Sequence, residues 1–137
     1  MQERTLELIR NDLKIITSNK LNTSQSKLLL IGVTYEILLR KDLFPKNSDL
    51  KKFVQLVFVE PIEGVKPFKE YLFVSRTLLS SRISKIILSQ FSYNNVMKTV
   101  DKLNAMLPQQ NNENKYSTRN TEQSMNEWVE FLRGNED

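Results

Sequence analysis

Residues 26–42 read SKLLLIGVTYEILLRKD, and this stretch decides the fold. When it is arranged as a helix, apolar side chains fall on nearly every face. A helix that is apolar all round has to be surrounded by other helices, since a surface helix keeps a polar face toward water. We therefore expect this helix at the centre of a bundle. Gly32, in its middle, costs about 1 kcal/mol relative to alanine, and we expect a close approach by a neighbouring helix to offset that cost.

The segments around this central helix also repeat apolar residues at helical spacing. Thr23 or Ser24 is expected to cap the start of the central helix, and Phe44-Pro45 is expected to end it. Upstream, a first helix is predicted by one apolar stripe, formed by Leu6, Ile9, Leu13 and Ile16.

Three more helices are predicted downstream. Ser48 is expected to cap a third helix over residues 48–58. Part of it, VQLVFVEP at 54–61, has the composition of a strand, but its place after a capped polar turn favours a helix. Pro67 suits the first turn of a long fourth helix that runs to Gln90. Ser92 or Asn94 begins a fifth, whose apolar stripe is Val96, Val100, Leu103 and Leu107.

The predicted fold class is therefore all-α, with a five-helix bundle in a core domain of residues 1–108. Pro108 stops the fifth helix. Residues 109–120 read QQNNENKYSTRN and have no apolar periodicity, which is typical of a flexible polar linker. Thr121 then begins a short C-terminal amphipathic helix over residues 121–134, which Gly134 ends.

The C-terminal helix carries one apolar stripe, which we predict to be a protein-binding surface. Its members fall at positions i, i+3, i+4 and i+7, the anchor spacing of a helix that lies in a groove. Tryptophan is strongly enriched at interaction hot spots, and the chain has a single one. The groove belongs either to the protein's own core or to another chain, a partner or a second copy, and we favour another chain. The stripe consists of Met125, Trp128, Val129 and Leu132.

Positive charge is concentrated in the body of the chain. The net charge is +4, but residues 1–107 hold 17 Lys and Arg against 10 Asp and Glu, and residues 108–137 hold 3 against 6. Basic residues around the turn after the central helix, which we call the basic corner, together with two arginines of the fourth helix, are candidate phosphate contacts. The alternative for the fourth helix is that its serines allow close packing while its arginines remain in water. The candidates are Arg40, Lys41, Lys46, Lys51, Lys52, Arg76 and Arg82.

Composition narrows the function classes. The chain has no histidine and no cysteine, the side chains most used in acid–base catalysis, nucleophilic catalysis and metal binding. No catalytic, cofactor-binding or metal-binding pattern stands out, so we do not expect an enzyme. The apolar run 28–33 is too short to span a bilayer, and we expect a cytoplasmic protein without a membrane partner. The leading hypothesis is a small accessory or regulatory protein that binds a macromolecular partner. The alternatives are a nucleic-acid-binding subunit and an immunity or inhibitor protein.

Overall fold

The computed structural model describes residues 5–108 and 127–133. Within these residues every regular element is helical, which confirms the predicted all-α fold. The main helices are α1 (Leu6–Thr17), α2 (Thr23–Leu38), α3 (Leu50–Val54), α4 (Arg76–Gln90) and α5 (Tyr93–Met106). Shorter pieces are the 3₁₀ turns η1 (Asn47–Asp49) and η3 (Glu70–Val74) and the π-helical η2 (Gln55–Val59), which continues α3. Residues 127–133 form a short C-terminal helix. The predicted linker 109–120 lies outside the described residues.

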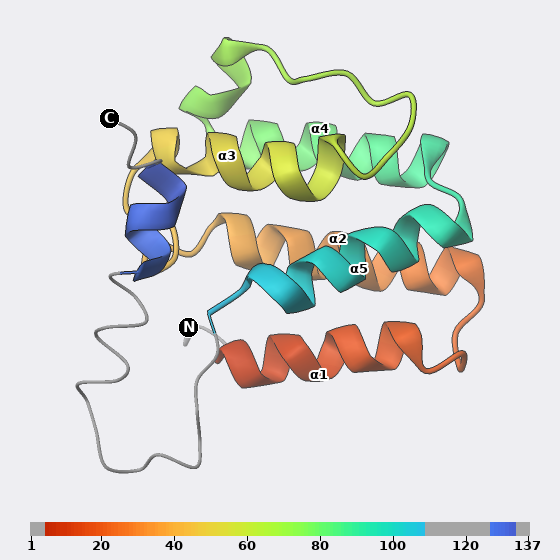
Figure 1. The fold of residues 1–137 in the computed structure, drawn as a ribbon. Helices are drawn as coiled ribbons and strands as arrows, with labels where there is room; N and C mark the ends of the chain where they lie inside the picture. The colour runs from red at the N-terminus through yellow and green to blue at the C-terminus, as the bar shows by residue number, and fades with distance from the viewer. Residues whose placement is uncertain (1–4, 109–126, 134–137) are drawn as a thin grey trace, which may run out of the picture.

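The helix α2 is central, as its sequence predicts. It packs against α1, α4 and α5 (Figure 1). The predicted stripe of α1 is buried against the core, and so is the stripe of α5. The coverage of α2 is incomplete, because Leu28 remains 60% exposed and Leu39 41% exposed. None of the described helices combines the length and the hydropathy needed to cross a membrane.

The predicted starts of the second and third helices are wrong by one or more residues. Asn22, not Thr23 or Ser24, caps α2: its side chain accepts the Gln25 N–H at 2.8 Å, and the Gln25 side chain accepts the Asn22 N–H at 3.0 Å. This reciprocal capping box satisfies two backbone donors at once, which a lone hydroxyl cannot do. In the third helix Ser48 lies inside η1 and does not cap it.

The fourth helix departs most from prediction, since it begins at Arg76 and not at Pro67. Ser75 has extended backbone angles (φ −136°, ψ 118°), and its hydroxyl accepts the Leu78 N–H at 3.2 Å. A serine that bonds its backbone locally in this way competes with a continuous helix. The break lets η3 turn Leu72 and Phe73 into the core.

Two other expectations are confirmed. Ser92 caps α5, accepting the Asn95 N–H at 3.1 Å. The segment 54–59 is helical and not a strand, with π-type turns in η2.

The close approach expected at Gly32 is absent. This residue is exposed, and a Cβ atom added to it would meet nothing within 4 Å. Small polar side chains are instead buried on α2 and α4, the two helices that pack against each other. The hydroxyl of Thr34 bonds the Leu30 carbonyl at 2.8 Å, and that of Ser84 bonds the Ser80 carbonyl at 2.8 Å. Ser80 and Ser84 of α4 are therefore packing residues.

We predict that Gly32→Ala stabilises the protein. The substitution removes backbone freedom from the unfolded chain and meets no steric obstacle, so the free energy of unfolding should rise by about 0.5–1 kcal/mol in urea titrations. Gly64→Ala is the matched control, because Gly64 has φ +92°, a region that strains any side chain. That variant should lose stability. A loss in Gly32→Ala as well would contradict the open environment described for this residue.

Candidate functional site

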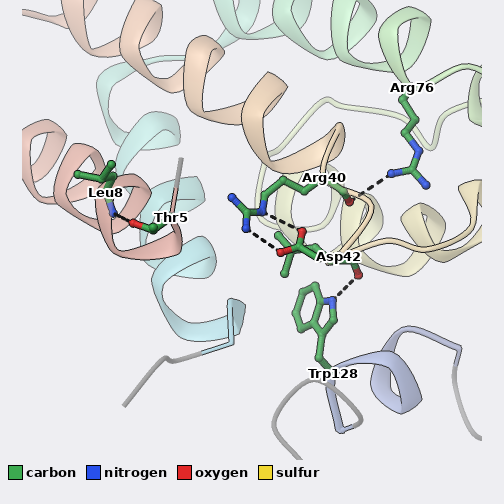
Figure 2. A network of polar contacts seen from close by, with 7 residues as sticks. Thr5, Leu8, Arg40, Asp42, Arg76 and Trp128 are labelled. Atoms are coloured by element: carbon green, nitrogen blue, oxygen red, sulfur yellow. Dashed lines mark hydrogen bonds and ion pairs between the residues drawn. The ribbon is translucent and has the colours of Figure 1, made fainter. Parts of the chain in front are cut away.

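The C-terminal helix 127–133 lies on the protein's own core. The indole ring of Trp128 stands edge-on to Phe44 and Phe53, with ring centroids 5.8 Å away in both cases. Its Nε1–H donates to the Leu43 carbonyl at 2.6 Å (Figure 2). Trp128 is 5% exposed and Leu132 4% exposed. The ring is thus packed and its one polar atom is satisfied, as a buried tryptophan requires.

In this structure the described part of the predicted stripe lies on the protein's own core. Trp128 and Leu132 are buried, and Val129 packs partly buried against the same core. Met125 lies outside the described residues. Binding of a partner by these side chains stays a prediction, and it would require the helix to leave the core first.

An ion pair fastens the same helix. Arg133 donates to both carboxylate oxygens of Asp49, at 3.0 and 3.3 Å, and the backbone N–H of Lys46 donates to Asp49 at 2.8 Å. Burial raises the pKa of the Asp49 carboxyl. The hydrogen bonds from Arg133 and Lys46 and their positive charges outweigh burial, so the net pKa lies below its ordinary value of 3.8. The ammonium of Lys52 adds a cation–π contact, 4.4 Å from the ring centroid of Phe131.

The two arginines nearest the basic corner are occupied by the protein itself. Arg40 donates to both carboxylate oxygens of Asp42, at 3.0 and 2.7 Å (Figure 2). Arg76 donates to the backbone carbonyls of Leu38 and Arg40, both at 3.3 Å, and to that of Phe44. Burial lowers the pKa of Arg76. These guanidinium groups hold the turn after α2, and their contact with phosphate stays a prediction.

The other predicted phosphate contacts are divided between two places. Lys51 pairs with Glu70 at 2.6 Å, while Lys41 and Lys46 are exposed at the corner. Arg82 is elsewhere, on α4. The structure thus does not assemble the predicted cations into one surface.

Arg82 lines a groove that the sequence analysis did not identify. The groove has a volume of about 400 Å³ and lies between α4 and the segment that arches from η2 to η3 (Figure 1). Three cations line it, and neither a carboxylate nor any His or Cys does. Among the described residues no hydrogen bond or ion pair involves the side chains of these cations. The lining residues are Gly64, Val65, Lys66, Pro67, Phe68, Lys69, Tyr71, Leu72, Arg82, Ile86 and Gln90.

The fold fixes both walls of this groove. On α4, Arg82, Ile86 and Gln90 follow each other at four-residue intervals and therefore share one face. The opposite wall is the segment 64–72, which turns at Gly64 and is anchored by the buried Leu72. It is also tied to the rest of the fold by polar contacts. Glu70 of the segment pairs with Lys51 at 2.6 Å, and just after the segment the Val74 carbonyl accepts a hydrogen bond from Asn47 Nδ2 at 3.0 Å.

A signal for this groove was present in the sequence. Residues 66–71 read KPFKEY, in which lysines alternate with aromatic rings. Such interleaving marks surfaces that bind flat anionic ligands. The predicted helix from Pro67 made this pattern look unimportant, because a continuous helix would have distributed these side chains over several faces.

Comparison of the chain with protein-family models, with curated proteins and with solved structures finds no match.

We predict that Trp128 reports a docked helix in the isolated protein. As the chain's single tryptophan, it should emit blue-shifted fluorescence in dilute solution. Trp128→Ala should lower the free energy of unfolding by about 3–5 kcal/mol. Trp128→Phe keeps a ring but leaves the Leu43 carbonyl without its donor, and should cost about 1–3 kcal/mol. Red, solvent-like emission with unchanged stability would mean that the helix is not docked.

We also predict a pH-dependent contribution from the Asp49–Arg133 pair. A folded-state pKa below the ordinary one stabilises the fold above pH 3.8, and this stabilisation is lost as the pH falls through the folded-state pKa. Arg133→Gln should therefore be less stable than the wild type at pH 7, and the difference should narrow below about pH 4. Urea titrations at several pH values measure it. Lys98→Gln, which removes an exposed cation from α5, should show no such narrowing.

Proposed function

We propose that this protein is a non-enzymatic accessory protein that binds a negatively charged macromolecule through the groove between α4 and residues 64–72. One observation carries the proposal. In the described part of the chain, the groove gathers Lys66, Lys69 and Arg82 without any carboxylate, next to the rings of Phe68 and Tyr71. Cations in a concave surface concentrate an anionic ligand, because the low-dielectric walls of a cleft focus the electrostatic field.

The surfaces favoured by the sequence support this function less well. In the C-terminal helix, Trp128 and Leu132 are covered by the core. At the basic corner, Arg40 and Arg76 bond to the protein itself. The groove, by contrast, is lined by three cations that bond no other described residue.

The groove is suited to binding and not to turnover. Its lining supplies charge, stacking surface and one amide, from Gln90, but no pair of a nucleophile and a base. The alternative of an immunity or inhibitor protein has no residue in the described structure that selects it. The proposal places the protein in the cytoplasm, where a chain without cysteine is well suited to reducing conditions.

We predict that reversing the groove's charge weakens polyanion binding beyond the effect of net charge. Lys66→Glu/Lys69→Glu/Arg82→Glu should elute from immobilised heparin at a markedly lower salt concentration than the wild type, since each lost contact removes a counterion-releasing charge. The matched control, Lys14→Glu/Lys98→Glu/Lys102→Glu, changes net charge equally through exposed lysines of α1 and α5. Equal elution of the two variants would show that retention follows net charge alone, and would remove the groove from the proposal.

A further inference from the structure

The groove also indicates which polyanion it takes. Building on the binding function proposed above, we infer that the ligand is single-stranded nucleic acid. One base would stack on Tyr71, with the neighbouring phosphates at Lys66, Lys69 and Arg82.

The ring of Tyr71 favours a ligand that carries a flat aromatic base. It is 53% exposed, although it lines a pocket and belongs to η3, whose neighbouring residues Leu72 and Phe73 are buried. Within the described residues it has no aromatic partner, whereas Phe44, Phe53 and Phe58 in the core are paired edge to face. A half-exposed, unpaired ring beside cations is the arrangement on which proteins stack nucleic-acid bases, since every base has a flat π face.

The shape of the site favours a single strand over a duplex. Reading duplex DNA needs an element that projects into a groove of the DNA. Here the groove belongs to the protein, and segment 64–72 forms the wall facing Arg82, Ile86 and Gln90 on α4. A hollow of about 400 Å³ lies at the lower end of small-ligand pockets, and is suited to one unstacked nucleotide at a time. Bases of a single strand are free to enter such a hollow, while bases of a duplex are not.

The lining of the groove also favours nucleic acid over an acidic peptide. Carboxylates would satisfy the three cations and a peptide backbone could bond the amide of Gln90, but neither group would stack on the exposed face of Tyr71. A primary amide carries both donors and an acceptor, as does the edge of a base. The combination of cations, one ring and one amide therefore matches a nucleotide more completely than it matches an acidic side chain.

Fluorescence anisotropy with the full chain and a labelled oligothymidylate of about 12 nucleotides tests this inference. Tyr71→Ala should weaken binding by about 5- to 150-fold, the range found when one stacked base loses its ring. Tyr71→Phe should restore binding, because stacking needs the ring and not the hydroxyl. With three phosphates neutralised, log K against log salt should have a slope of about −2. The triple reversal at Lys66, Lys69 and Arg82 should abolish most of that slope.

Controls make the result specific. Tyr93→Ala removes a tyrosine of α5 whose hydroxyl bonds Asn19, outside the groove, and should bind as the wild type does. Unchanged Trp128 emission verifies that each variant is folded. No binding of the oligonucleotide, equal binding of Tyr71→Ala, or equal binding of the corresponding duplex would overturn the inference. Displacement by polyglutamate at equal charge concentration would overturn it in favour of an acidic protein. If heparin retention still depends on the groove in any of these cases, the proposed binding function stands and only the ligand assignment fails.

Discussion

The guanidinium of Arg76 fixes the corner on which much of the structure depends. A helix that ends without a glycine leaves carbonyl groups that need donors, and α2 ends at Leu38 in this way. Backbone N–H groups of Leu39 and Arg40 bond some of them. Arg76, the first residue of α4, donates to the carbonyl of Leu38 and also to that of Phe44. In the turn that follows α2, the carbonyl of Leu43 and the ring of Phe44 contact Trp128. Docking of the C-terminal helix therefore depends on Arg76, which belongs neither to that helix nor to the turn on which the helix packs.

The parts of the fold that follow from one segment's own pattern were predictable. The stripes of α1 and α5 and the cap at Ser92 depend on spacing within a single helix, and all three are found. The errors lie where two solutions compete locally. At the start of α2 a reciprocal bond between Asn22 and Gln25 prevails over a single hydroxyl cap. Before α4, burial of Leu72 and Phe73 prevails over the helix that Pro67 favours. Only the tertiary context decides such cases.

The candidate site was less predictable than the fold, for an electrostatic reason. Sequence shows how many cations a segment has, but not which of them the protein neutralises itself. Arg40 and Arg82 look alike in the sequence, yet one is paired with Asp42 and the other lines an acid-free groove. The difference depends on the positions of carboxylates and backbone carbonyls that folding brings together. The alternation of lysines and aromatic residues in KPFKEY is visible in the sequence. It indicates a binding surface only once the segment is known not to be a continuous helix.

The position of Trp128 has a consequence for the order of folding. Its hydrogen bond to Leu43 spans 85 residues of chain, and its pocket exists only once the segments around Phe44 and Phe53 have packed. Closing so long a loop carries an entropic cost that early local contacts do not bear. During synthesis the residues of this pocket leave the ribosome well before residues 127–133 do, since the chain emerges from its N-terminal end. The nascent protein therefore passes through a stage in which two core aromatic rings lack their cover, and in that interval it is most exposed to aggregation and to capture by chaperones.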